Sequence, residues 1–567
     1  MANNRLMIEE KMDLLIDEFK ELNAYNKKKE EDDIDSKFDE TVKTYNSLMR
    51  NYFVHHGAEQ ASPEQLTALC EEWYKFTRTG WAGHTTFAQT SVTAVSTGTP
   101  GGDNVGLTCT PSTDTKANVD QYAGLPQFAC VDVNYEVTSD GDILITAIDG
   151  ITQNFERYNP EKYVGVMQMA LYHYWHEENE SYMHGLTDTM LHTYGNIEPL
   201  PESIKPDGTL RHFIVHSKYM SKTVNGKMTS CSGLIPTAYN ISHNSLHSLS
   251  KQNGTMYSGG TTCDDAFLKL MAYVKYKSLT LDGILQGCCN NNHQYTVAVS
   301  ETGVKRVILS ADQANNFSVG MSVLIGTNSS GTDRNTGSVY SISSNNGMLI
   351  TSIMDVIIEN IQYKAVYVDS ENTFDTTAGT TIVSTFHWKS GSCDNVLGND
   401  GSPVSCTSGK YPAKLQGIEF MVGGYEVLAD VIMNIEDDGN GNGCYQPYIC
   451  RNASKQSTSI TSDYIATGLK IPCPDSDNWY YIKKLGYAKG YFFPIEVGGS
   501  SSTYTRDAFY MNNKAARGTR EVLAFGHLHA GTGCSGLSHL FGGLGLSNAY
   551  WSFLARLSPN GTRGELA

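Results

Sequence analysis

The sequence predicts a β-rich α+β fold with a coiled coil at its amino terminus. Three observations lead to this prediction. Apolar residues near the amino terminus are spaced alternately four and three residues apart, which is the seam of a coiled coil. Much of the remaining chain alternates short apolar runs with Gly, Asn and Ser turns, as β-strands do. The last fifty residues are one-fifth glycine, and because each interior glycine costs a helix roughly 0.5–1 kcal/mol relative to alanine, they are expected to form turns rather than a long helix.

Chain length and charge limit the architecture and the partners. At 567 residues, the chain is expected to hold about three to four domains. We divide it into a coiled-coil or assembly helix at 1–56, a β-rich connecting domain at 57–205, and a carboxy-terminal domain at 206–567 that carries an inserted small β-domain at 294–388. A net charge of −18 argues against a nucleic-acid partner. No apolar run of about 18 residues predicts membrane insertion, and the amino terminus shows no secretory signal peptide.

The thirteen cysteines are an odd number, so at least one of them cannot pair within the chain. No C-x-x-C pair is present, and the adjacent Cys288 and Cys289 cannot easily bond to each other. We expect most of the cysteines to be free thiols, as in a protein that is assembled in a reducing cytoplasm.

Two apolar seams mark the amino-terminal region. The first consists of Ile8, Met12, Leu15, Phe19 and Leu22, and the second consists of Ile34, Phe38, Thr41, Tyr45 and Leu48. A charged run separates the two seams, and the second seam does not continue the heptad repeat of the first. Because each seam is too short for a stable isolated helix, the region is expected either to self-associate or to dock. We favour a homotrimeric stalk or a peg for a larger assembly; the alternative is an amphipathic helix folded back on its own domain.

The region 57–205 is predicted to be β-structure. Alternating segments such as VDVNYEV and DILITAID, with Gly-Asp turns between segments, predict strands. His173, His176, Glu177 and His184 are close in sequence and suggest a metal site, but their spacing is not that of H-E-x-x-H. Because histidine is common in aromatic cores, we assign no metal to this group.

Local signals also organise the carboxy-terminal domain. Asn225-Gly226 between alternating segments predicts a hairpin. Residues 264–276 predict a helix that covers a sheet with one apolar face, formed by Phe267, Leu270, Met271 and Val274. The segment 294–388 alternates regularly in runs such as YTVAVS and MSVLIG, which predicts a small barrel or sandwich. Because insertions are tolerated best at exposed loop tips, this module is expected to project from the core with its two ends close together.

The last fifty residues interleave two kinds of position. One kind is expected to form a buried or hydrogen-bonded scaffold: Phe525, Gly536, Trp551 and Arg556. Arg556 in particular is expected to pair with a carboxylate or with backbone carbonyls, because an unpaired guanidinium is costly to bury. The other kind follows no helical or strand period and is expected to lie on one exposed receptor-binding surface: His527, His529, Ser538, His539, Phe541, Tyr550, Ser552 and Phe553.

This final segment resembles the carboxy-terminal repeat of phage proteins that are diversified by retroelements. The shared residues are Phe525-Gly526, Gly536-Leu537, Leu546-Ser547-Asn548-Ala549, Trp551 and Ala555-Arg556-Leu557-Ser558. The sequence departs from the family form at His527 and His529, where the relatives usually place Gly and Trp. Two explanations stay open: these are diversified positions, or the retroelement link is absent here. The resemblance covers roughly 210–287 and 409–558.

The resemblance implies a C-type-lectin-like fold, shared with formylglycine-generating enzymes, and the function of a phage virion adhesin. Such a tail fibre or tail-tip receptor-binding protein is assembled in the host cytoplasm and resides in the virion. It contacts other virion proteins, here through region 57–205, and attaches to a carbohydrate or protein receptor on the host surface. The alternatives are a structural fibre or capsid decoration protein, and a polysaccharide-degrading enzyme.

The sequence favours adhesion over catalysis. Its nearest serine motif, Gly533-Cys534-Ser535-Gly536, is not the G-x-S-x-G of a hydrolase. Formylglycine-generating enzymes use paired cysteines with copper near the end of the fold, whereas Cys534 is the only cysteine after Cys473 here. A polysaccharide hydrolase needs two carboxylates about 5–9.5 Å apart in a groove, and no sequence feature nominates such a pair.

One oxygen-rich loop is a candidate for structural calcium. Asp438, Asn440 and Asn442 match the first half of an EF-hand loop, D-x-N-x-N-G. The twelfth position is Ile449, which cannot ligate calcium, so a complete EF-hand is excluded. A Gly/Asn/Asp turn explains the same residues equally well, and no other cofactor is predicted.

Overall fold

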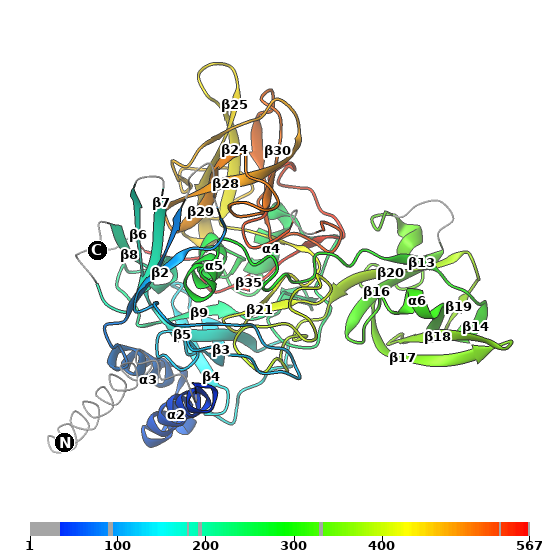
Figure 1. Cartoon of the computed structure of the whole chain (residues 1–567), viewed down its shortest axis with the longest axis horizontal. Coiled ribbons are helices and arrows are strands. Elements are labelled where there is room, and N and C mark those ends of the chain that lie inside the picture. Colours follow the sequence, from blue (N-terminus) through cyan, green and yellow to red (C-terminus); the bar gives the residue numbers. More distant parts are fainter. Residues whose placement is uncertain are drawn as a thin grey trace.

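Figure 1 shows the computed structural model, which describes residues 34–88, 95–178, 181–190, 196–327, 333–531 and 535–564. Strands far outnumber helices in this part of the chain, so the predicted β-rich α+β class is confirmed. Helices α4 (His243–Lys251) and α5 (Thr262–Met271) lie in the middle of the molecule, with β-structure on several sides of them. None of the described helices is long and apolar enough to cross a membrane.

The amino-terminal helices pack on each other within the chain. Helix α3 (Pro63–Phe76) begins at a capping box formed by Ser62 and Gln65. Aromatic side chains of helix α2 (Ile34–His55) contact Trp73 of α3 with ring centroids 5.2–6.3 Å apart. The Trp73 indole N–H also donates a hydrogen bond to the hydroxyl of Tyr45 (3.0 Å). The pair of helices therefore has its own aromatic core.

This packing bears on the predicted coiled coil. The first seam, at residues 8–22, and the side chains of residues 34–44 lie outside what the structure describes. In the second seam, Tyr45 is buried and Leu48 packs against the core of its own chain. For these two residues the structure corresponds to the alternative of a helix folded back on its own domain. The homotrimer stays a prediction.

Two sheets form most of the amino-terminal half. One has the order β2-β1-β7-β6-β8, with strands Thr99–Gly102, Ala82–Ala88, Ser181–Thr187, Tyr172–Glu178 and Asn196–Pro199. The other has the order β4-β3-β5-β9, with strands Ile143–Ile148, Val131–Val137, Tyr163–Met169 and Phe213–Ser217. Strands β3 and β4 coincide with the segments VDVNYEV and DILITAID. Because β9 pairs with β5 along its whole length, the boundary predicted at 205/206 separates strands of one sheet.

Helix α5 is enclosed on all sides. It continues into a π-helical turn, η3 (Ala272–Tyr276), and every residue of α5 is buried. The predicted helix is present, but the prediction that it covers a sheet with one apolar face describes only part of its surroundings. The helix lies inside the molecule, and even its charged residues are buried in pairs. Asp265 pairs with Lys269, and Asp264 accepts a hydrogen bond from His216 of β9 (2.7 Å).

The predicted insertion contributes a sheet of its own. Its order is β13-β20-β16-β17-β18-β15, with strands Gln294–Thr296, Thr381–Trp388, Met321–Thr327, Met348–Ile358, Ile361–Val368 and Arg306–Leu309. Strands β14 (Glu301–Val304) and β19 (Phe374–Thr376) form a separate ladder, and a short helix, α6 (Ala311–Ala314), precedes β16. The two ends of the segment meet, because the backbone N–H of Thr385 donates to the carbonyl of His293 (2.9 Å). The module projects to the right in Figure 1.

Two further sheets and several short ladders make up the rest. A seven-stranded sheet has the order β29-β28-β30-β33-β32-β23-β34, with strands Tyr491–Val497, Asn478–Ala488, Ala508–Met511, Leu540–Phe541, Leu523–Ala524, Tyr425–Val427 and Phe553–Leu554. Strands β24 (Val431–Asp437) and β25 (Gly443–Ile449) form a hairpin that pairs with β31 (Gly518–Arg520), β26 (Ile465–Ala466) and β27 (Ile471–Pro472). The short ladders pair β10 with β11 (Thr223–Val224, Lys227–Met228), β21 with β22 (Ala413–Leu415, Ile418–Phe420) and β12 with β35 (Ser258–Gly259, Leu557–Ser558).

The predicted hairpin at Asn225-Gly226 is confirmed. These two residues join β10 to β11 and both have positive φ angles, 50° and 81°. A type I′ turn requires positive φ at both central residues, which is why the Asn-Gly pair signals it in sequence.

Trp73 offers a test of the amino-terminal core. It is fully buried against α2, so replacing it with alanine is expected to lower the free energy of unfolding by about 3–5 kcal/mol. Phe76 is 37% exposed on the same helix, and Phe76→Ala is expected to change stability by no more than about 0.5 kcal/mol. Urea denaturation of both variants measures the difference; equal effects would contradict the observed packing.

Candidate functional site

The last fifty residues close the core of the protein. They supply β31 to β35. Strand β31 pairs with β24, and the other four pair with β30, which directly precedes the segment, and with β23 and β12, which come from much earlier in the chain. All four predicted scaffold residues are buried, in agreement with the expectation. At Gly536, an added Cβ would lie 2.1 Å from a carboxylate oxygen of Asp507, so only glycine fits there. Phe525 has a φ of 71°, an uncommon conformation for a residue with a side chain.

Arg556 ties this segment to three other parts of the chain. Its guanidinium donates to the backbone carbonyls of Ser217 (2.8 Å) and Glu419 (2.7 Å). It also pairs with the carboxylate of Glu426 (3.2 Å). Both charged side chains are about 2% exposed, and a buried pair is stable only when its remaining hydrogen-bonding groups are satisfied in this way. The expected pairing of Arg556 with a carboxylate and with carbonyls is confirmed.

The predicted binding residues do not all lie at the surface. His529 is exposed, and His527, Phe541 and Tyr550 are half-buried. The expectation of exposure is wrong for the remaining four, which are buried: Ser538, His539, Ser552 and Phe553. The reason is that β33 and β34 are short strands of the seven-stranded sheet, so that they and the turns beside them belong largely to the core.

The half-buried residues join a continuous row of rings that we call the aromatic band: Trp479, Tyr510, Phe541, Tyr425, Phe553 and Tyr550. Tyr510 and Phe541 stack in parallel with ring centroids 4.6 Å apart, and Trp479 stands edge-on to both. The row continues from Phe541 through Tyr425 and Phe553 to Tyr550, with centroid separations of 5.3–6.2 Å. Such contacts hold aromatic rings in fixed orientations.

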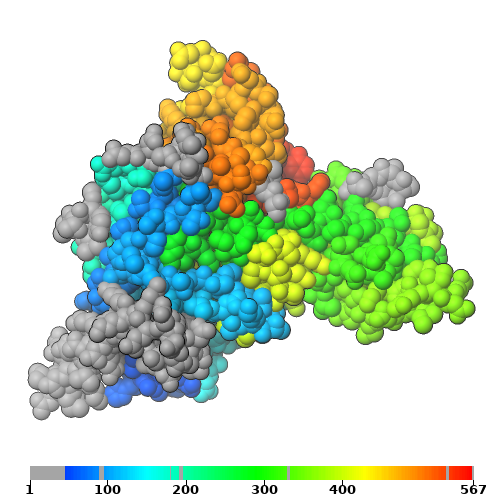
Figure 2. Space-filling model, viewed as in Figure 1, coloured from blue at the N-terminus to red at the C-terminus, as the bar shows by residue number. Residues whose placement is uncertain are grey.

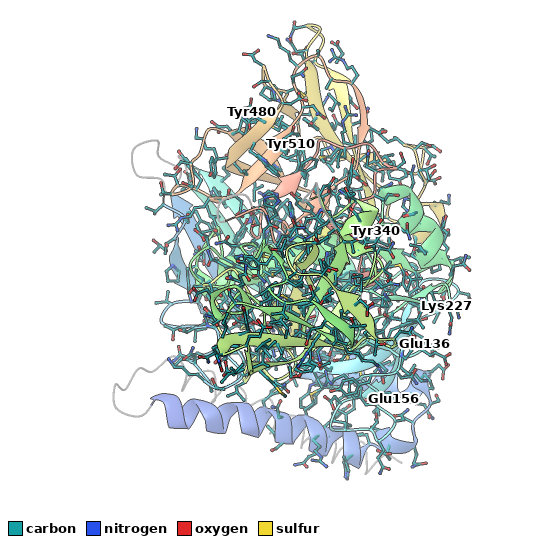
Figure 3. All side chains as sticks on the ribbon, turned by 90° about the vertical axis from the view of Figure 1, so that its right-hand side faces the viewer. Glu136, Glu156, Lys227, Tyr340, Tyr480 and Tyr510 are labelled. Carbon is teal, nitrogen blue, oxygen red and sulfur yellow. The ribbon has the colours of Figure 1, made fainter. Side chains whose placement is uncertain are left out.

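Strand register explains one half of the band. Trp479 of β28 lies opposite Tyr510 of β30, and Tyr510 lies opposite Phe541 of β33. Opposite residues on neighbouring strands point to the same face of a sheet, so the three rings stand side by side. Figure 3 shows Tyr510 in the upper lobe, the part of the molecule that contains β24, β25, β28 and β30, close to the labelled Tyr480.

Sequence analysis missed Trp479, Tyr510 and Tyr425, because they precede the last fifty residues. The available signal was the run of aromatic residues in NWYYIKK (478–484). An aromatic run in a strand predicts that one ring faces the core and the next faces outward. It does not tell which distant strand lies beside it.

The inserted module contacts Trp551, the residue that follows Tyr550 at one end of the aromatic band. Arg334 lies 4.8 Å above the ring of Trp551, and Asn335 accepts a hydrogen bond from the Trp551 backbone N–H (3.0 Å). Arg334 is itself held by the carbonyl of Thr385 (3.0 Å) and the side chain of Asn292 (2.7 Å). The module therefore braces the carboxy-terminal segment as well as projecting from the core. In Figure 2 this segment, in red, lies between the upper lobe and the right-hand module.

Three histidines that lie near the aromatic band or near Trp551 are uncharged at neutral pH. Burial lowers the pKa of His387, His527 and His539 to about 3, so all three imidazoles are neutral. Burial also raises the pKa of Asp507 to about 7, although its carboxylate accepts a hydrogen bond from the Ser538 backbone N–H (2.7 Å).

The candidate calcium loop is the turn of the β24–β25 hairpin. The Asp438 carboxylate accepts hydrogen bonds from the backbone N–H groups of Asn440 (2.7 Å) and Asn442 (3.0 Å). The loop therefore has the hydrogen bonds of a Gly/Asn/Asp turn, and no ligand role for it is assigned. In the histidine group, His173 contacts His184 (3.0 Å), whereas His176 lies at the exposed end of β6.

The twelve cysteines that the structure describes are free thiols, as expected; Cys534 lies outside the described residues. The chain matches no protein-family model, and a search of curated proteins finds no match. The fold and the site define a β-rich α+β protein whose aromatic band has four half-buried rings, Trp479, Tyr510, Phe541 and Tyr550, joined through the buried Tyr425 and Phe553.

Asp507 makes the stability of this region depend on pH. Its folded-state pKa of about 7 lies above the ordinary value of 3.8, so between these two values the unfolded chain binds fewer protons. Stability therefore falls as pH rises through this window, by up to about 1.4 kcal/mol per pH unit for one group. Asp507→Asn cannot ionise and is expected to flatten this slope in urea denaturation series.

A matched control for this experiment is Asp437→Asn. Asp437 is exposed, and its hydrogen bonds with Arg517 and with backbone N–H groups lower its pKa. The control is therefore expected to keep the wild-type slope over the same window. Parallel curves for wild type and Asp507→Asn would contradict the assignment.

Proposed function

We propose that this protein is a phage virion adhesin, a tail fibre or tail-tip receptor-binding protein. Its carboxy-terminal domain would have a C-type-lectin-like fold and would attach the particle to a carbohydrate or protein receptor on the host surface. The single observation that carries the proposal is the aromatic band. It supports an adhesin because its four half-buried rings, held by ring contacts, offer contact area at little cost in side-chain entropy.

The resemblance of residues 210–287 and 409–558 to phage proteins diversified by retroelements adds to this proposal. Four of the residues first assigned to the surface are buried. The proposed contact residues are therefore Trp479, Tyr510, Phe541 and Tyr550, together with the exposed His529. If the chain assembles as a homotrimer through residues 1–56 and joins other virion proteins through 57–205, repetition on the particle would raise avidity by roughly 10²–10⁴-fold.

A polysaccharide-degrading enzyme is less well supported. A cavity of about 170 Å³ lies between β8, the turn after β28 and the carboxy-terminal residues. Among its lining residues Glu198 is the one carboxylate, beside Arg451 and Arg563. A glycoside hydrolase uses two carboxylates that flank the scissile bond, about 5–9.5 Å apart. This cavity does not offer such a pair, so the aromatic band remains the better candidate site.

Cell attachment tests the adhesin proposal. Labelled protein is first screened against a panel of bacterial strains to find one that it binds. Tyr550→Ala and Phe541→Ala are then expected to weaken binding to that strain by about 1–2 kcal/mol, or roughly 5- to 30-fold, as for aromatic contact residues. The matched control is Tyr158→Ala, since Tyr158 is 71% exposed and does not belong to the band.

Melting temperature separates lost contact from lost structure. Tyr550→Ala is expected to melt close to the wild type, whereas Trp551→Ala removes a buried ring and is expected to destabilise the protein by about 3–5 kcal/mol. Normal attachment of folded Tyr550→Ala and Phe541→Ala proteins would overturn the proposal. A structural fibre or decoration protein would then explain the structure better. The same conclusion would follow if the labelled protein bound to none of the bacterial strains.

A further inference from the structure

A buried lysine lies between two buried aspartates at the junction of the two halves of the molecule. Lys275, in the π-helical turn η3, is fully buried; Asp120 and Asp400 are 7% and 2% exposed. The Lys275 Nζ lies 2.8 Å from Oδ2 of Asp400 and 3.1 Å from Oδ2 of Asp120. The three residues come from the connecting region, from the end of α5 and from the segment after the inserted module.

The Asp400 carboxyl group is held in one orientation. Its Oδ1 accepts a hydrogen bond from the Gln416 backbone N–H (2.7 Å), and its Oδ2 accepts one from the Tyr276 hydroxyl (2.9 Å). Carboxylate oxygens of Asp120 and Asp400 and the thiol of Cys109 lie within 4.8 Å of one another. These three side chains resemble a metal site, but the positive charge beside the two carboxylates is that of Lys275 itself.

Burying the three charged side chains of Lys275, Asp120 and Asp400 away from water has a high desolvation free energy. Burial alone lowers the pKa of Lys275, but Asp120 and Asp400 outweigh it and hold the pKa well above its usual range. Burial raises the pKa of Asp120, in spite of the nearby amine. A neutral amide in place of the Lys275–Asp400 ion pair would remove two buried charges and their desolvation cost. Asp120 would lose its ammonium partner and keep the hydrogen bonds from the backbone N–H groups of Tyr122 and Ala123 (3.1 and 3.3 Å).

We propose that Lys275 and Asp400 are joined by an isopeptide bond, and that Asp120 relays a proton during its formation. The bond between Nζ of Lys275 and Cγ of Asp400 forms, and the bond between Cγ and Oδ2 of Asp400 breaks. Nζ starts as an ammonium group beside the Asp400 carboxylate: one of its three protons stays on the amide nitrogen, and the other two leave with Oδ2 as one water molecule. Asp120 takes one of them from Nζ and passes it to Oδ2, so no oxidant or other reactant is needed.

The surroundings of Asp400 suit this step. The Gln416 backbone N–H points at Oδ1, the oxygen that carries negative charge while Nζ adds to Cγ, and a fixed donor at that position stabilises the charge. The Tyr276 hydroxyl donates to the departing Oδ2. Because the site is closed to solvent, little water is present to hydrolyse the product. The link would join α5 and η3 to the segment that follows the inserted module.

Two other buried lysine–aspartate pairs act as internal controls. Lys269 and Asp265 pair within α5 and have no second carboxylate in the ion pair. Lys218 contacts Asp132 and Asp394 (2.6 and 3.5 Å), but Arg157 pairs with the same two carboxylates. Arg157 cannot give up a proton and pairs with both carboxylates, so neither of them is free to relay a proton from Lys218. Neither pair is expected to condense.

Mass spectrometry of the full, denatured chain tests the proposal. The wild-type protein is expected to be lighter than its sequence by one water molecule. Tryptic digestion should yield one branched peptide that joins the peptides containing Lys275 and Asp400, because a linked lysine resists trypsin. Lys275→Arg and Asp120→Asn are expected to show the full mass of their sequences and to give no branched peptide.

The wild-type spectrum decides the matter even where a variant fails to fold. A wild-type protein with the full sequence mass would overturn the proposal. A branch at Lys269 or Lys218, or between Lys275 and Asp120, would overturn the assignment of the bond to Asp400. A branched peptide in folded Asp120→Asn would overturn the proton relay.

Discussion

The buried ion pair between Arg556 and Glu426 is the interaction on which the rest of the structure depends. Its two side chains are almost inaccessible to water, and the guanidinium also donates to carbonyls of β9 and β22. Removing either partner would leave a buried charge without compensation. The pair therefore fixes the carboxy-terminal segment relative to β9 of the amino-terminal half, to β22, and to β23 of the seven-stranded sheet. Two further buried contacts lie nearby on the same segment: Arg563 with Asp430, and Ser558 with Asp264.

This anchoring explains how a glycine-rich segment presents a defined surface. The segment forms strands of only two or three residues each, and none of them would be stable alone. Pairing with β23, β30 and β12 holds them, and the aromatic band follows from that register. The inserted module adds Arg334 and Asn335 against Trp551. Parts of the chain that are far apart in sequence thus determine where each ring of the band lies.

Local patterns predicted much of this fold. Alternation located strands in the connecting region and the inserted module, and Asn225-Gly226 located a hairpin, because these signals depend on neighbouring residues. The folded-back helix shows the limit of such patterns, since the spacing of Tyr45 and Leu48 is the same whether the partner is another copy or α3. Strand β9 likewise carries no local sign that it pairs with β5 across the predicted domain boundary.

The candidate site was predicted less well, for a physical reason. Residues without a helical or strand period give no indication of which side faces water, so Ser538, His539, Ser552 and Phe553 could not be recognised as buried. His539 is uncharged in the core because burial lowers its pKa to about 3, which a sequence does not reveal. By contrast, the burial of Arg556 with a carboxylate was predictable, because a guanidinium among apolar scaffold residues needs a partner.

The stability of Arg556→Met tests the central claim most directly. If the ion pair holds the core together, this variant should lose about 3–5 kcal/mol of unfolding free energy, because it leaves the Glu426 carboxylate buried without its partner. Arg517→Met removes an exposed arginine that pairs with Asp437 at the surface, and it should leave the unfolding curve almost unchanged. Urea denaturation of the two variants beside the wild type gives the answer. An Arg556→Met curve that coincides with that of Arg517→Met would contradict the account.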